Sequence, residues 1–167
     1  MNKQEKLSAA EAFKTNIESI FSHYYSQQMA ESVKRGMLNR VKNGYAVGRP
    51  PLGYSKTEMP GFFKVNRHGR ALRETLKKLA NGDTNIESAT INIALMFWGS
   101  NKLKSWSTTK TKRLLSDPYY AGYISYKGQL YQGLHEPLIT EDEQVKLLEL
   151  LEKHNYSNSL KQLDKNL

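Results

Sequence analysis

The chain has 167 residues, with 25 lysines and arginines against 16 aspartates and glutamates, which gives a formal net charge of +9 at pH 7. This length predicts one or two small domains, and the positive excess favours a polyanionic partner, most often nucleic acid, although ribosome-associated proteins are basic as well. There is no cysteine, which excludes disulfides and cysteine-based zinc sites within this chain. Because there is no apolar run behind the N-terminus and no apolar stretch near the ~20 residues of a membrane span, we expect no signal peptide and no membrane partner.

The first predicted element is a long helix over residues 8–43. Ser8 and Glu11 have the spacing of a capping box, and Gly44 is a typical residue to end a helix in the left-handed conformation. Apolar side chains recur along it at Phe13, Ile17, Ile20 and Tyr24, then at Val33, Met37 and Val41. Steps of four advance the face by about 40° each, so the buried face drifts around the helix. The two halves should therefore face different partners, the first half an upstream segment or another copy.

The last turns of this helix are basic. They carry Arg35, Arg40 and Lys42, of which Arg35 and Lys42 are seven residues apart and share a face. Such a face either contacts DNA or is simply solvated. Gly36 costs the helix about 1 kcal/mol relative to alanine, which close approach of another backbone or a flexible point would explain. We take the three basic side chains as DNA-binding candidates.

A stiff peptide at residues 44–54 follows the helix. Its centre, Gly48-Arg49-Pro50-Pro51, can be neither helix nor central strand, because each proline fixes φ, lacks an N–H and pushes the preceding residue to extended geometry. A narrow extended peptide that carries one guanidinium fits the minor groove of DNA, which is only about 6 Å wide. Such stretches are also common interdomain linkers. The pattern therefore predicts a linker that either only spaces two domains or contacts DNA through Arg49.

Residues 55–153 are predicted to form a compact domain that begins with a short strand at 62–65. Asn66 caps a helix to residue 80, and Thr84 with Glu87 forms a capping box that opens a second helix to residue 98. The inward residues of the first of these helices are predicted to be Ala71, Leu72, Leu76 and Leu79.

The second half of this domain is predicted to hold a short helix at 108–115, a β-hairpin that turns at Lys127-Gly128, and a final helix. Ser107 caps the short helix, and Thr140 with Glu143 forms the capping box of the last one. The core residues predicted for the last helix are Val145, Leu147, Leu148, Leu150 and Leu151. Residues 154–167 are predicted to be a polar, frayed tail.

Three short helices followed by a hairpin is the element order of a winged helix-turn-helix domain. The third helix carries short hydroxyl side chains and cations, which suit a helix in the major groove. The DNA-binding candidates are Ser107, Thr108, Thr109, Lys110, Lys112 and Arg113, with Lys127 at the hairpin tip as a wing contact. The same helix could be an ordinary amphipathic surface helix, and the tyrosines of the hairpin could be cross-strand pairs.

No arrangement of catalytic or metal-binding residues is apparent. The four histidines sit in separate predicted elements without metal-ligand spacing, and His135, before Glu136-Pro137, is predicted to be structural. The stretch from Gly48 to Gly53 lacks the Lys-Ser/Thr of a phosphate-binding loop. We therefore predict no catalytic residue, no metal and no cofactor within this chain.

The chain resembles the large serine recombinases, the integrases and transposon resolvases of mobile elements. The resemblance lies in QMAESVKRG at 28–36, GRPPLGY at 48–54, Trp106-Ser107, LLSDPYYAG at 114–122 and HEPLIT at 135–140. It implies a mixed α/β, mostly helical fold in which a long helix precedes a compact, winged-helix-like recombinase domain with a small β-hairpin. It also implies that the long helix packs between subunits and lies over the minor groove, and that the linker crosses that groove.

The resemblance further implies a reaction for the parent protein. The family cleaves DNA through a serine nucleophile, forms phosphoserine links and rotates subunits to exchange strands, without a metal for chemistry. The serine and the catalytic arginines belong to a domain that should precede Phe13, and the cysteine-bearing zinc ribbon that usually follows has no match here, so the chain looks like an excised, non-catalytic fragment. Expected partners are double-stranded DNA and, in the full-length protein, further copies in a dimer or tetramer. The expected location is the bacterial cytoplasm, at the nucleoid.

Three hypotheses follow. The first is the DNA-binding part of a large serine recombinase, with residues 1–43 as linker and dimerisation helix, 44–54 as DNA-contacting linker and 55–153 as recombinase domain. The second is a stand-alone winged-helix transcriptional regulator whose first helix dimerises. The third is a basic protein–protein adaptor, for which no DNA affinity is expected even at low salt.

Overall fold

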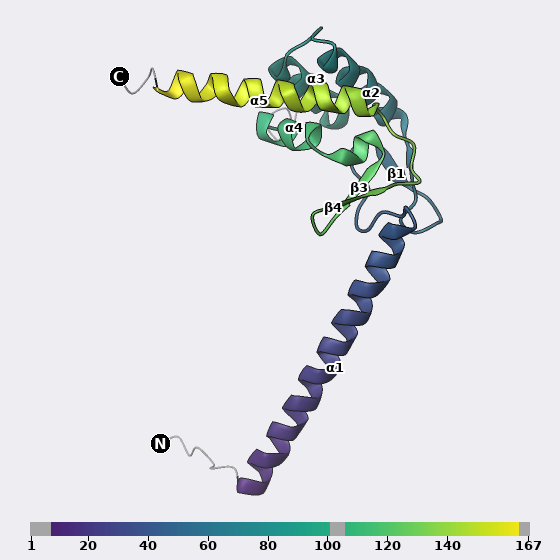
Figure 1. Cartoon of the computed structure of the whole chain (residues 1–167), viewed down its shortest axis with the longest axis vertical. Coiled ribbons are helices and arrows are strands. Elements are labelled where there is room, and N and C mark those ends of the chain that lie inside the picture. Colours follow the sequence, from purple (N-terminus) through teal and green to yellow (C-terminus); the bar gives the residue numbers. More distant parts are fainter. Residues whose placement is uncertain (1–7, 101–105, 164–167) are drawn as a thin grey trace. The chain divides into compact units, whose positions relative to one another are not determined.

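The computed structural model describes residues 8–100 and 106–163 and separates into two units, residues 1–39 and residues 40–167. The described residues form five α-helices and two short antiparallel hairpins (Figure 1). This confirms the prediction of a mixed α/β, mostly helical fold. The compact unit begins at Arg40, so the last turn of the long helix belongs with it rather than with the rest of that helix.

The long helix α1 spans Ala9–Lys42, close to the predicted bounds. Its capping box is formed as predicted: the Ser8 N–H donates to Glu11 Oε2 (2.9 Å), and the Glu11 N–H donates to Ser8 Oγ (3.3 Å). Most large apolar side chains of the first unit are exposed, among them Phe13 at 66% and Met37 at 37%, whereas Leu38 is half-buried. Only Val41, in the last turn and within the compact unit, is fully buried.

The compact unit continues with the hairpin of β1 (Tyr54–Lys56) and β2 (Phe63–Val65), in which Tyr54 faces Val65. Helices α2 (Arg67–Ala80), α3 (Ile86–Trp98) and α4 (Thr108–Leu115) come next, followed by the 3₁₀ turn η2 (Pro118–Ala121). The second hairpin pairs β3 (Tyr123–Tyr126) with β4 (Gln129–Gln132), and helix α5 (Glu141–Leu163) is last.

The core lies between the helices. Leu72, Leu76 and Leu79 of α2 are buried against α3, which packs in turn on α4. Helix α5 runs across this layer (Figure 1) and packs on α2 and α4 through Leu147 and Leu151. Its predicted capping box is present, because the Thr140 N–H donates to Glu143 Oε2 (2.8 Å) and the Glu143 N–H donates to Thr140 Oγ1 (3.2 Å).

Several local predictions were wrong. Ala71 is exposed, because the buried face of α2 is set by Gly69, Leu72, Leu76 and Leu79, and Ala71 lies off that arc. Val145 and Leu148 are exposed for the same reason on α5. The cap of α3 is Asn85 rather than Thr84: Asn85 Oδ1 accepts the Ser88 N–H (2.8 Å), which places buried Ile86 at the first helical position.

The polar tail predicted at 154–167, interpreted as frayed from Tyr156 onward, is helical as far as Leu163. Helix α5 continues through Leu163. The segment is polar, but it contains no glycine or proline that would end a helix. Polarity alone does not break a helix, because the backbone hydrogen bonds still form along it.

Candidate nucleic-acid interface

The first part of the linker is fixed to the compact unit. Gly44 adopts the predicted left-handed conformation (φ +79°), and its carbonyl accepts the Leu134 N–H (2.9 Å). The Ala46 N–H donates to the Gly61 carbonyl (2.8 Å), and Ala46 is buried. The chain that leaves α1 is therefore held at two points, between the turn before β2 and the loop after β4.

The centre of the linker is the exposed part. Val47, Gly48 and Arg49 are all exposed, and Pro50 is half-buried. Gly48 has a φ of +108°, which an L side chain rarely adopts, and a Cβ there would touch nothing within 4 Å. Glycine at this position therefore serves the path of the backbone, which presents Arg49 on a short exposed loop whose two ends are anchored.

The far end of the linker is packed against α2. The Asn66 N–H donates to the Gly53 carbonyl (3.0 Å), and a Cβ on Gly53 would lie 2.9 Å from Gly69 Cα. Two glycines thus let the linker backbone touch the first turn of α2. On the other side, the Tyr120 hydroxyl donates to the Leu52 carbonyl (3.1 Å). Residues 51–54 are built into the compact unit instead of spacing two domains.

A hollow of about 340 Å³ joins the linker to α4. The linker contributes Pro51 and Leu52 to its wall, and α4 contributes Lys110 and Arg113. The remaining wall residues are Trp106, Leu114, Asp117 and Tyr120. The structure therefore brings together two of the predicted DNA-binding segments, the proline-rich linker and the basic helix, although they are far apart in the sequence.

Helix α4 is held in one orientation by its buried face. Thr111 is fully buried, and its hydroxyl accepts the Trp106 indole N–H (2.9 Å). The same hydroxyl lies 2.9 Å from that of Thr90, which donates to the Ile86 carbonyl (2.7 Å). This chain of hydrogen bonds ties α4 to α3. It turns the opposite side of α4 outward, where Ser107, Thr109, Lys110 and Arg113 are exposed and Thr108 and Lys112 are half-buried.

Two details of α4 depart from the sequence expectation or add to it. Ser107 occupies the cap position, but its side chain makes no capping hydrogen bond. The Lys110 ammonium lies 5.9 Å from the centre of the Trp106 ring, and Trp106 stacks on Trp98 at 4.9 Å between ring centres. The Trp106 ring, which lines the hollow, therefore lies beside the Lys110 ammonium of this helix.

The other predicted binding residues lie elsewhere. Arg40 is exposed, and its Nη2 donates to the Pro60 carbonyl (2.8 Å), so it braces the turn before β2. Lys42 is exposed at the end of α1, and Arg35 is exposed in the separate unit of residues 1–39. Lys127 sits at the tip of the second hairpin with a positive φ of 50°, and its ammonium lies 5.6 Å from the Tyr126 ring centre.

Sequence reasoning missed the residues that hold the linker in place. Gly69 is the clearest case, because a glycine inside a predicted helix is unfavourable and signals close approach of another backbone. Tyr120 is the second, and nothing local marks its hydroxyl as a partner of the linker.

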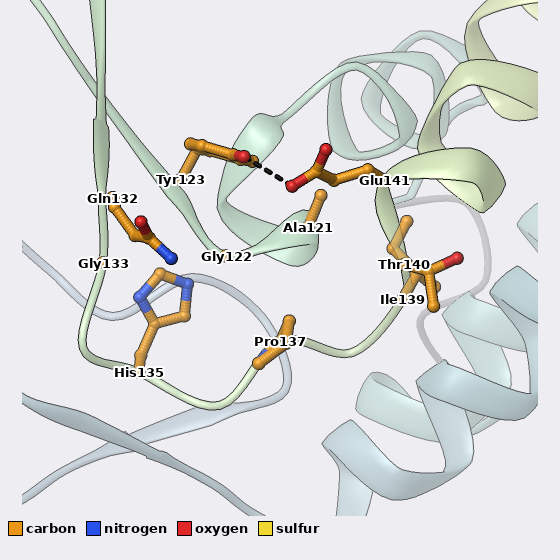
Figure 2. A pocket seen from close by; sticks show the side chains of 10 residues that line it. All are labelled: Ala121, Gly122, Tyr123, Gln132, Gly133, His135, Pro137, Ile139, Thr140 and Glu141. Atoms are coloured by element: carbon orange, nitrogen blue, oxygen red, sulfur yellow. Dashed lines mark hydrogen bonds between the residues drawn. The ribbon is translucent and has the colours of Figure 1, made fainter.

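A second hollow, of about 300 Å³, lies beside His135 (Figure 2). Three of the polar side chains that line it have partners: the Tyr123 hydroxyl donates to Glu141 Oε1 (2.5 Å), and the Thr140 hydroxyl accepts the Glu143 N–H at the start of α5. Among the described residues, no group of three or more His, Cys, Asp or Glu side chains could hold a metal ion. These hydrogen bonds hold the fold together and do not indicate a binding or catalytic site.

His135 is a core residue, as its sequence context predicts. Its exposed fraction is 6%, its ring stacks on that of Tyr119 at 3.6 Å between centres, and its Nε2 lies 2.7 Å from the Tyr119 carbonyl. That contact requires Nε2 to carry the hydrogen, and Nδ1 has no hydrogen-bond partner among the described residues. Burial lowers the pKa of His135 below its ordinary value of 6.5, against the smaller opposing effects of the Tyr119 carbonyl and Asp117.

This burial predicts a pH-dependent stability. A histidine whose pKa is lower in the folded than in the unfolded state binds fewer protons when folded, so its contribution is complete above pH ~6.5 and is lost as the pH falls below that value. The unfolding temperature should fall as the pH is lowered from 8 to 5, and this fall should be smaller in the His135→Gln variant. His23→Gln, on exposed α1, should keep the decline because it leaves His135 in place. An undiminished decline in the His135 variant would contradict the assignment.

The comparisons with known proteins follow this geometry. The sequence model of the family described as Recombinase matches residues 66–154, more than half of the chain. No curated protein matches the chain. Among the described residues, no helix is long and apolar enough to cross a membrane.

Two solved structures share the fold. One, described as the crystal structure of an LSR–DNA complex, is 19% identical with a TM-score of 0.56, and the match covers 74% of this chain and 38% of that one. The other carries the description "Sequence Requirements of the Listeria innocua prophage attP site". It is 19% identical with a TM-score of 0.53, and the match covers 72% of this chain and 51% of that one. This chain therefore spans about half or less of the length of those proteins. The family match runs over α2 to α5 and covers more than half of the chain, and the chain therefore belongs to the Recombinase family.

Proposed function

We propose that this chain is the DNA-binding portion of a site-specific large serine recombinase, which integrates or excises the DNA of a mobile element. The observation that carries the proposal is the hollow in which Pro51 and Leu52 of the linker meet Lys110 and Arg113 of α4. It makes the linker and the basic helix parts of one body, so both can contact one DNA duplex at a fixed separation. The net charge of +9 and the DNA complex among the structural neighbours support the same reading.

Each element has a separate role in the proposal. The exposed loop at 47–49 places Arg49 in the minor groove, where one guanidinium on a narrow backbone fits. The exposed side of α4 enters the adjacent major groove, where its hydroxyls and cations reach base edges and phosphates. Lys127 at the hairpin tip and Lys42 at the end of α1 contact the backbone. Arg40 contributes by holding the turn before β2, through its hydrogen bond to Pro60.

The exposed apolar side chains of α1 support a further part of the proposal. Residues such as Phe13, Ile20 and Met29 are more than half exposed in the single chain, which is unfavourable in water. Packing against another copy in a dimer or tetramer of the full-length protein would cover them. The proposed setting is the bacterial cytoplasm, where such a protein would act on nucleoid DNA.

Arg49→Ala is the test. It should weaken binding by about 1–2 kcal/mol, mainly at sites with an A·T-rich segment under the linker, because a narrow minor groove attracts an inserted arginine most strongly. Fluorescence anisotropy on duplexes that differ only in that segment measures the difference. Arg49→Lys keeps the charge and should recover backbone attraction but not the A·T preference. An equal loss on all duplexes would reject the minor-groove role.

A salt series with the unaltered chain tests the function itself. Binding that rests on phosphate contacts weakens steeply as salt rises, with a slope of about 0.9 per neutralised phosphate in a log–log plot. No affinity even at low salt would reject DNA binding and favour the adaptor alternative.

A further inference from the structure

A basic surface formed by the first hairpin and the start of α2 carries three cations that make no ion pair with any described residue. It consists of Ser55, Lys64, Asn66, Arg67 and Arg70, and we call it the α2 basic surface. Ser55 and Lys64 are directly opposite each other in the first hairpin. The Asn66 Nδ2 donates to Ser55 Oγ (3.1 Å), while its Oδ1 accepts the Gly69 N–H (2.9 Å) to cap α2. Hairpin and helix thus form one continuous surface.

The cations of this surface are exposed and are not used internally. Lys64, Arg67 and Arg70 are all exposed and form no ion pair with any described residue. Arg73, on the same helix, is different: its Nη2 contacts Glu136 Oε1 at 2.6 Å and its guanidinium also donates to the Leu138 and Pro137 carbonyls. Arg73 is therefore structural, whereas Lys64, Arg67 and Arg70 form no such ion pair.

The position of these arginines is electrostatically unfavourable for the free protein. The first turns of α1, α3 and α5 carry acidic residues, as the helix dipole favours, but the first turns of α2 and α4 carry none. Arg67 opens α2 and Arg70 follows within one turn. A positive charge at a helix N-terminus is repelled by the positive end of the helix dipole. A negatively charged partner would relieve this repulsion.

The α2 basic surface is in direct contact with the linker. Gly53 touches Gly69, and its carbonyl accepts the Asn66 N–H (3.0 Å). Arg49 is four residues before Gly53, and an extended chain covers at most ~3.6 Å per residue, so Arg49 Cα lies within about 14 Å of Gly53. B-DNA carries one charge per ~1.7 Å of helix axis. A duplex that receives Arg49 therefore has several phosphates within the reach of this surface.

We propose that the α2 basic surface binds the phosphate backbone of the DNA duplex beside the groove that the linker enters; this contact rests on the proposed function. The linker then contacts two basic elements: Pro51 and Leu52 share a hollow with α4, and Gly53 touches the start of α2. The contact positions the protein and does not read sequence, because guanidinium and ammonium groups on phosphates are indifferent to the bases.

The test compares the full 167-residue chain with its Arg67→Ala/Arg70→Ala variant on a random-sequence duplex and on an A·T-rich duplex, over a salt series. We expect a 10- to 50-fold weaker Kd on both duplexes, with a salt slope lower by about 1–2, as the loss of one or two phosphate contacts requires. The variant Arg67→Lys/Arg70→Lys should keep most of the affinity. Lys78→Ala, exposed near the other end of α2, should bind as the unaltered chain does.

Thermal unfolding separates a binding role from a structural one. Since both arginines are exposed and disfavoured by the dipole, the alanine variant should unfold at the same or a higher temperature. Unchanged affinity and salt slope in that variant, on DNA that the unaltered chain binds, would overturn this inference and leave the proposed function standing. A loss confined to one duplex would overturn it as well, because it would indicate base readout. Absence of DNA binding by the unaltered chain would overturn both.

Discussion

Gly69→Ala should lower the free energy of unfolding of the compact unit by more than about 3 kcal/mol, at the upper end of what overpacking costs. A Cβ on Gly69 would overlap the Gly53 carbonyl oxygen and lie 2.8 Å from Val65 Cγ1. The first of these partners is backbone, which cannot rotate away as a side chain can. Gly69 is within a regular helix and not at a positive φ, so glycine is needed there for space and not for conformation.

Chemical denaturation followed by circular dichroism measures this effect, with Ala71→Gly as the matched control. Ala71 is exposed on the same helix, two residues on, and its replacement should cost only about 1 kcal/mol through helix propensity. If the free energy of unfolding falls by a similar amount in both variants, the contact between the linker and α2 is looser than described. The prediction matters for function, because Gly53 cannot move from Gly69 without shifting the linker that carries Arg49.

The sequence predicted most of the features that have a local signal, although the Ser107 side chain makes no capping hydrogen bond. The capping boxes at Ser8 and Thr140, the cap at Asn66 and the hairpin turn at Lys127 each lie within a few residues, and all are present. The errors arise where neighbouring signals compete. Thr84 and Asn85 are both good caps, and only the need to bury Ile86 at the first helical turn selects Asn85.

Some features of the candidate site could be predicted from local sequence, and others could not. The linker and α4 could each be identified from composition, because prolines and a run of hydroxyls and cations have meaning by themselves. Their meeting at one hollow could not be predicted, because Leu52 and Tyr120 are joined by a hydrogen bond between distant parts of the chain. The same holds for Gly53 and Gly69, which touch without any periodic pattern that links them. Close approach of two backbones leaves only an unexplained glycine in the sequence.

Charge reversal at that hollow, Lys110→Glu/Arg113→Glu, should weaken DNA binding by about 100- to 1,000-fold at moderate salt. Both residues are exposed on α4 beside the linker, so each substitution removes an attraction to phosphate and adds a repulsion. The buried side of the helix, with Thr111 bonded to Trp106, is untouched, and the fold should therefore be retained. Anisotropy titrations over a salt series give both the loss and the expected fall in slope, of two or more.

The matched control is Lys146→Glu/Lys153→Glu, which makes the same change of net charge at two exposed lysines of α5. Its effect should be small, because α5 carries Glu141, Asp142 and Glu143 in its first turn and is already unfavourable for contact with phosphate. Equal losses in the two variants would mean that net charge alone governs binding, and the hollow between linker and α4 would then have no special place in recognition. A large loss only at α4 would instead fix the side of the molecule that meets DNA, since Lys110 and Arg113 share their hollow with the chain that leads directly to Arg49.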